Sequence, residues 1–218
     1  MMPLIASAQA QINTKKVKIA DFTQKVTKVV LPGNAFYDGA LQEEIAARWR
    51  VSPYEFCDLQ EFENLKSNSQ YYFMLITEGQ FRKESEPGLQ FITLVKGGPE
   101  AEKGIDNMLE VVTVPFCAAD DPSGRELVFL PALIDIMQEY AVETMEKDLY
   151  TLGGLGTYTS NITKTGNMNI AFAEEDLSNE VTEAVIKANF DDLITLTDAD
   201  SVDEIFENQE PNTLVSYV

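Results

Sequence analysis

The run 71–76 (YYFMLI) constrains the fold most, because it is apolar at every position. A strand with apolar side chains on both faces has to be covered on both faces, as in a sheet that lies between two layers of helices. The run 109–116 has the same two-sided apolar character. Strands that alternate with helices then predict an α/β fold, in which a mixed, centrally buried β-sheet is flanked by helices on both faces as three layers.

Shorter patterns place further elements around these two strands. Apolar residues at helical spacing predict an amphipathic helix over 38–50, and Asp58 followed by Glu61 is a capping box that starts a second helix. The run 89–96 reads as a strand that returns antiparallel to 71–76, so the sheet is expected to be mixed. Other predicted strands are 26–31, 54–57, 193–197 and 213–218.

The order helix, strand, capped helix, strand occurs twice, once in 41–76 and once in 181–218. The two stretches share few identities and differ by an insertion. Both a duplication and a chance recurrence of α/β patterning remain open. In the second stretch the sequence predicts a helix capped at Ser201.

Composition changes divide the chain. We expect a main α/β domain over 11–152 and a loop or linker rich in Gly, Thr and Asn over 153–173. A helix–strand–helix–strand unit over 174–218 is expected to pack on the main domain. Residues 1–10 are interpreted as the remnant of an export signal peptide.

The interpretation of the first ten residues rests on an apolar stretch, 3–5, followed by the small-residue triplets 6–8 and 8–10. An apolar segment ahead of small residues at positions −3 and −1 is typical of a secretory cleavage site. Cleavage there would make Gln9 or Gln11 the first residue of the mature chain. The pattern therefore predicts a periplasmic or secreted protein. The alternative is a frayed N-terminal tail that carries a few apolar residues.

Charge and composition exclude several classes of function. The formal net charge is −20, and such a protein is repelled by phosphate backbones, so no nucleic-acid partner is expected. The chain has no histidine, which excludes Ser-His-Asp triads and histidine-based metal sites. No run approaches the ~18 apolar residues of a transmembrane helix. The basic stretch 15–28 is either a solvated strand edge or a strip that docks an acidic partner.

Three carboxylates follow predicted strands and are the candidate ligand-binding residues: Asp58, Asp120 and Asp121. Strand ends of this kind are where α/β sheets bind ligands, and paired carboxylates act as acid and base or hold a cation. The alternative is structural, with Asp58 as a helix cap and Asp120 as part of a turn. The sequence assigns no catalytic residue, no metal ligand and no cofactor.

Cysteines and aromatic residues each allow two interpretations. Cys57 and Cys117 follow predicted strands, and they could form a disulfide if those strands were neighbours in an oxidising compartment. Two buried free thiols are the preferred interpretation. Trp49 and the aromatic run 71–73 are expected in the core rather than in a ligand-stacking patch.

The stretch 29–76 resembles bacterial envelope proteins of unassigned function. It carries a strand that ends near a glycine, a helix that closes on Trp49, the run 52–56 (SPYEF) and the capped helix of Glu61 and Phe62. The same arrangement is similar to the α/β domain at the amino end of TolB and in curli-secretion channel subunits. The resemblance implies an envelope role by assembly or binding and supplies no active-site residue.

The expected function is therefore that of an exported, non-catalytic binding or assembly component whose partner is another envelope protein. A periplasmic module that binds a small molecule or a cation is the first alternative. A carboxylate-based glycan hydrolase is the second, and it would need two acids about 5–10 Å apart. The sequence leaves the oligomeric state open.

Overall fold

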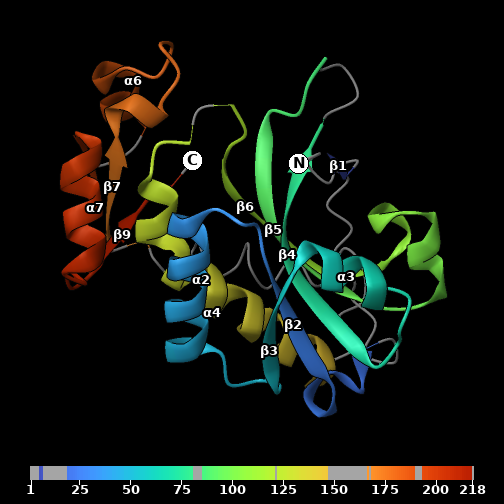
Figure 1. The fold of residues 1–218 in the computed structure, drawn as a ribbon. Helices are drawn as coiled ribbons and strands as arrows, with labels where there is room; N and C mark the ends of the chain where they lie inside the picture. The colour runs from blue at the N-terminus through green and yellow to red at the C-terminus, as the bar shows by residue number, and fades with distance from the viewer. Residues whose placement is uncertain are drawn as a thin grey trace. The chain divides into compact units, whose positions relative to one another are not determined.

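The computed structural model describes residues 5–6, 19–80, 85–120, 122–146, 166, 168–189 and 193–217. The chain divides into two compact units, residues 1–151 and 152–218, and Figure 1 shows the elements of both. Each unit is an α/β arrangement of its own.

The sheet of the first unit has the strand order β3-β2-β4-β5-β6, and β1 pairs with β4 beside this path. Strands β2, β3 and β4 are mutually parallel, whereas β5 runs antiparallel to both of its neighbours. The sheet is therefore mixed, and the hairpin predicted from the sequence is confirmed. The strands are β1 (Ile5–Ala6), β2 (Val26–Leu31), β3 (Tyr54–Asp58), β4 (Tyr71–Gly79), β5 (Leu89–Lys96) and β6 (Leu109–Ala118).

Helices cover both faces of this sheet. On one face Phe62 of α3 (Leu59–Leu65) meets Phe73 of β4, with ring centroids 5.1 Å apart. On the other face Tyr72 packs on Phe22, and Phe22 packs on Trp49, the residue that ends α2. Helix α2 (Ala35–Arg48) contacts α4 (Arg125–Glu146), and α4 contacts β6 (Figure 1). The predicted three-layer α/β fold is confirmed, and Trp49 lies in the core as expected, with 1% of its surface exposed.

Topology in this unit follows a doubly wound pattern. The chain leaves β2 through α2 to reach β3, and it returns through α3 to β4 on the other side of β2. Helix α2 begins three residues before the predicted start, because the Asn34 side chain accepts a hydrogen bond from the Phe36 N–H. Between β5 and β6 the chain forms two 3₁₀ segments, Pro99–Lys103 and Ile105–Asn107, which are separated by Gly104 at φ +116°.

The second unit has the same topology. Its sheet has the order β8-β7-β9 with all strands parallel, and the chain runs β7–α6–β8–α7–β9. The helix–strand–helix–strand order seen twice in the sequence therefore corresponds to two β-α-β-α-β units with equivalent strand orders. The elements are β7 (Asn169–Ala173), α6 (Glu183–Asn189), β8 (Ile194–Thr197), α7 (Ala199–Glu207) and β9 (Thr213–Val215).

Two sequence-based expectations for this unit are corrected. Strand β7 lies in the range expected to be loop, and it is the central strand of the small sheet. Helix α7 is capped by Asp198 rather than by Ser201, because the Ser201 N–H donates to Asp198 Oδ1 at 2.8 Å. Asp198 thus occupies the place that Asp58 holds in the first unit, and the buried side chains of Phe62 and Val202 each follow their cap by four residues.

Candidate functional site

The carboxyl ends of β2, β3, β4 and β6 lie at one edge of the main sheet, because β5 alone runs the other way. The connection that leaves β2 contains α2, and the connection that enters β4 contains α3, and these two helices lie on opposite faces of the sheet. The space beyond the carboxyl ends of β2 and β4 is therefore a topological switch point. Ligands of open α/β sheets bind at such a point.

Asp58 ends β3 and lies beside Leu31 in the β2–β3 register. Its Oδ1 accepts a hydrogen bond from the Glu61 N–H at 2.7 Å, so its side chain caps α3. One of its oxygens is thereby committed to the backbone donors at the start of a helix. The helix-cap interpretation accounts for the position of Asp58.

Asp120 lies two residues beyond β6 and is exposed, and Asp121 falls outside the described residues. Strands β3 and β6 are the opposite edges of the path β3-β2-β4-β5-β6, so four inter-strand spacings separate their ends. At about 4.8 Å each, these place the ends of β3 and β6 about 19 Å apart, and the two residues from the end of β6 to Asp120 span at most about 7 Å. The structure does not bring the two together, and this pair does not meet the separation of about 5–10 Å that a glycan hydrolase needs.

A different cluster lies at the same edge, where α2 and α4 begin. Glu126 is 1% exposed, and its carboxylate accepts hydrogen bonds from the Tyr37 hydroxyl at 2.7 Å and from the Gly124 N–H at 2.8 Å. Cys117, near the end of β6, donates its thiol proton to Gln90 Oε1 at 3.5 Å. We call Tyr37, Cys117 and Glu126 the carboxyl-edge cluster.

The electrostatic environment of this cluster favours the protonated forms of the Tyr37 hydroxyl and the Cys117 thiol. Burial and the hydrogen bond to Glu126 raise the pKa of Tyr37 well above its usual range. Burial and the negative charge of Glu126 also raise the pKa of Cys117, to about 11. Because the thiolate is the reactive form of cysteine, Cys117 is a poor nucleophile at neutral pH. The cluster can hold groups by hydrogen bonds, and its geometry fastens the first turns of α2 and α4 to each other.

No local sequence pattern predicts this cluster. Ser123 followed by Glu126 has the spacing of a capping box, a pattern that ordinarily leaves the Glu side chain at the helix surface. Burial of Glu126 depends on Tyr37, which lies 89 positions away in the chain. Only the packing of α2 against α4 brings the two residues together.

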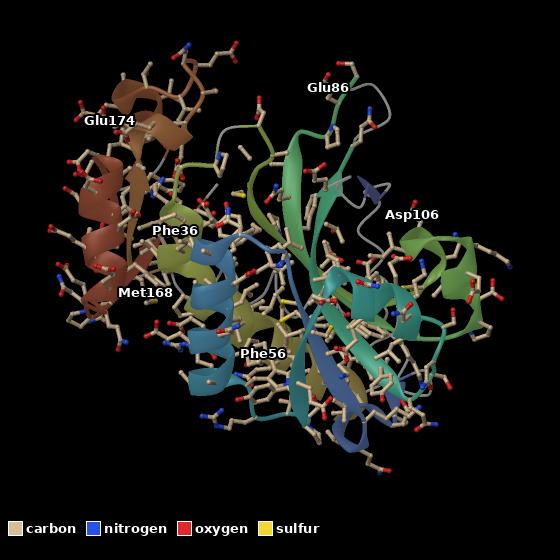
Figure 2. All side chains as sticks on the ribbon, viewed as in Figure 1. Phe36, Phe56, Glu86, Asp106, Met168 and Glu174 are labelled. Atoms are coloured by element: carbon tan, nitrogen blue, oxygen red, sulfur yellow. The ribbon has the colours of Figure 1, made fainter. Side chains whose placement is uncertain are left out.

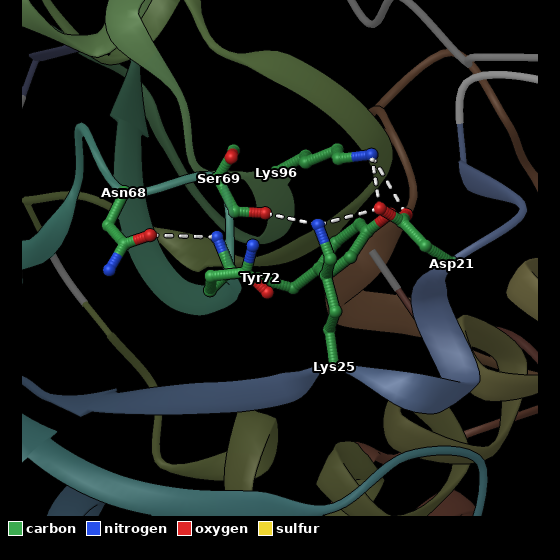
Figure 3. A network of polar contacts seen from close by, with 7 residues as sticks. Asp21, Lys25, Asn68, Ser69, Tyr72 and Lys96 are labelled. Carbon is green, nitrogen blue, oxygen red and sulfur yellow. Dashed lines mark hydrogen bonds and ion pairs between the residues drawn. The ribbon is translucent and has the colours of Figure 1, made fainter.

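A second polar network lies at the opposite edge of the sheet and is drawn in Figure 3. Asp21 pairs with Lys25 at 2.7 Å and with Lys96 at 2.8 Å, and it accepts a hydrogen bond from the Tyr72 hydroxyl at 2.6 Å. Burial by itself would raise the pKa of Asp21, but these donors outweigh it and hold the pKa well below its usual range. The Lys25 ammonium also donates to the Ser69 carbonyl. The network ties the turn before β2 to the ends of β4 and β5.

The basic stretch of the sequence is largely committed within the first unit, as far as the structure describes it. Lys28 is 7% exposed and pairs with Glu55 at 2.8 Å and Glu61 at 2.7 Å. Lys25 belongs to the network of Asp21. These two lysines are internal ion-pair partners, whereas residues 15, 16 and 18 lie outside the described ranges.

The two cysteines are free and buried, which confirms the preferred sequence interpretation. Strands β3 and β6 are not neighbours, so Cys57 and Cys117 lie on opposite edge strands of the sheet. Burial, together with the charge of Glu61, raises the pKa of Cys57 to about 11. Both thiols are therefore packed as small apolar groups.

Among the described residues, no three His, Cys, Asp or Glu side chains gather in a way that could hold a metal ion. No helix in the described ranges combines the length and the apolar character that crossing a bilayer requires. The chain has no significant match among protein-family models, curated proteins or solved structures. The resemblance to TolB and to curli-secretion channel subunits therefore stays a prediction.

Proposed function

We propose that this chain is an exported, non-catalytic binding or assembly component of the bacterial cell envelope, and that its partner is another protein. The proposal draws on the small-residue triplets 6–8 and 8–10, which have the form of a secretory cleavage site. It also draws on the resemblance of 29–76 to envelope proteins. Export would place the mature chain in the periplasm or outside the cell.

The observation that carries the proposal is the hydrogen bonding and the raised pKa values within the carboxyl-edge cluster. A nucleophile or general base has to be deprotonated near the working pH. Burial and the neighbouring carboxylate raise the pKa values of Tyr37 and Cys117 instead. Glu126 itself is occupied by two hydrogen bonds. Groups arranged in this way stabilise a fold and favour a function in binding over one in catalysis.

The surface beside this cluster suggests how a partner is held. Phe36, on the first turn of α2, is 79% exposed and is labelled in Figure 2. Exposed aromatic side chains are frequent anchors of protein interfaces. The net charge of −20 favours a partner that presents a basic surface, because complementary charge accelerates encounter.

The test is a crosslinked pull-down of the tagged native protein from its own cell envelope, with the bound protein quantified against the bait. We expect one stoichiometric partner and at least severalfold less of it with Phe36→Ala, since interface anchors contribute most of the binding energy. The matched control is Ile136→Ala, which truncates a 50% exposed apolar side chain on α4 and should leave capture unchanged. Capture of no stoichiometric partner, or equal capture by both variants, would refute the proposal in this form.

A further inference from the structure

Strand β4 continues past the end of its pairing with β2, on the side of the switch point. It runs from Tyr71 to Gly79, and β5 pairs with it along 72–79. On its other side the β2 ladder covers only 71–74. There β4 pairs next with β1, which meets it at Glu78 and Gly79 (Figure 1).

The backbone of β4 presents hydrogen-bonding groups on that side. The Tyr71 carbonyl accepts from the Gly97 N–H at 2.9 Å and the Gly79 carbonyl from the Gly88 N–H at 3.2 Å, so both carbonyls face β5 and its continuations. Successive residues of a strand direct their backbone groups to alternate sides. The N–H and C=O groups of Ile76 and Glu78 therefore face away from β5, toward the side on which β1 lies.

A two-residue ladder is a weak attachment. Very short strands contribute few hydrogen bonds, and such elements open at low free-energy cost. An extended segment that paired along 75–79 would form more of these bonds than β1 does. Strand addition of this kind supplies affinity through the main chain, and it occurs at exposed sheet edges.

We propose that the β4 edge at 75–79 is a strand-addition site for an extended segment of the partner protein, and that residues 5–6 of this chain occupy part of it here. The inference rests on the proposed function, since it adds a backbone contact for the same partner that Phe36 is proposed to hold. The segment lies parallel to β4, as β1 does. It is net basic, because the chain carries a formal charge of −20. Cleavage after Ala8 or Ala10 would remove β1 and with it the pairing that β1 makes to Glu78 and Gly79.

The test uses the full chain and a fluorescent peptide that contains residues 2–10 of this sequence (MPLIASAQA) followed by two lysines. Ile5→Pro and Ala6→Pro together remove the backbone donors of β1, and the freed edge should bind the peptide at least about tenfold more tightly than the unmodified chain does. Fluorescence anisotropy measures the affinity. Equal affinity for the two proteins would overturn the proposal.

Two further variants in the same background locate the site. Glu78→Pro and Glu78→Ala both remove the Glu78 carboxylate, but only Glu78→Pro also removes the N–H that faces this edge, so it should bind the peptide about tenfold more weakly than Glu78→Ala does. Equal binding by the two variants would overturn the proposal. Trp49 emission shows whether each variant is folded.

A measurement that leaves β4 unaltered guards against misfolding of the proline variant. In the chain that carries only Ile5→Pro and Ala6→Pro, peptide should slow amide hydrogen exchange at Ile76 and Glu78. Unchanged exchange at these two amides would contradict the site. A stoichiometric partner captured equally by Glu78→Pro and Glu78→Ala refutes the strand-addition site alone. Peptide bound at this edge without any captured partner refutes the proposed function alone.

Discussion

Removing one hydroxyl from the carboxyl-edge cluster should destabilise the first unit measurably. Tyr37→Phe leaves the ring on Phe116 in place but takes away the donor that lies 2.7 Å from Glu126 Oε1. The Glu126 side chain is 1% exposed, so water cannot readily replace that donor. A hydrogen bond to a charged group contributes about 1.5–3 kcal/mol, and we expect the variant to lose about 2 kcal/mol of unfolding free energy.

Urea unfolding followed by the emission of Trp49 is the assay, because Trp49 is the single tryptophan and lies in the first unit. A loss of 2 kcal/mol corresponds to about a 30-fold change in the folded-to-unfolded ratio. The control is Tyr54→Phe, which removes the hydroxyl of a half-buried tyrosine on the edge strand β3 and should cost less than about 0.5 kcal/mol.

A double-mutant cycle assigns the loss to the pair. Tyr37→Phe and Glu126→Gln should couple by about 1 kcal/mol or more, since the two side chains are in direct contact. A cost below about 0.5 kcal/mol for Tyr37→Phe, or additive effects in the cycle, would refute the reasoning that this hydrogen bond fastens α2 to α4.

Three other predictions test the structural roles assigned to charged and thiol groups. Asp58→Ala should lower the unfolding free energy by about 1 kcal/mol in the same urea assay, as loss of a helix cap does, and Asp58→Asn should keep most of it. The folded-state pKa of Asp21 lies below its unfolded value of about 3.9, so the stabilisation from ionised Asp21 is present above that pH and is lost as the pH falls further. Between pH 7 and pH 3, the unfolding free energy measured in urea should therefore fall less for Asp21→Asn than for the unmodified chain. An equal fall in the two proteins would contradict the assignment. Burial raises the pKa values of Cys57 and Cys117 to about 11 from an unfolded value of about 8.5, so stability should be full below pH 8.5 and decline as the pH rises toward 11. Iodoacetamide at pH 8 should accordingly alkylate both thiols slowly until urea unfolds the chain, and rapid alkylation of the native protein would show that they are not buried.

The sequence predicted most of the main sheet because its strands carry local signals. The range 89–96 matches β5, and 26–31 matches β2, because turn residues or polar residues border each apolar run. The two-sided apolar character of 71–76 correctly implied helices on both faces. Strand β7 was missed because its five residues directly follow a long Gly-, Thr- and Asn-rich stretch, and two of them are alanines.

The features that local sequence patterns do not predict depend on contacts between residues far apart in the chain. Asp58 and Asp120 each follow a strand, but the strand order places those strands at opposite edges of the sheet. The same order separates Cys57 from Cys117. Glu126 and Tyr37 are in contact because α2 and α4 pack on the same face. Strand order and helix packing are tertiary properties, which a local pattern does not encode.

The order of elements that recurs in the sequence corresponds to a topology that recurs in the two units. Asp58 and Asp198 cap equivalent helices, and these helices lead into β4 and β9, which lie beside the equivalent strands β2 and β7. Capping at the same place in both units follows from the need to satisfy the first backbone donors of a helix that begins directly after a strand. The equivalence therefore concerns fold construction, and it assigns no binding role to either aspartate.

The most direct test of the central claim is the N-terminal residue of the native protein recovered from fractionated cells. Mass spectrometry of the periplasmic or secreted fraction should find a mature chain that begins at Gln9 or Gln11, without β1. A native protein that retains residues 1–8 and occurs only in the cytoplasmic fraction would contradict the export on which the envelope role depends.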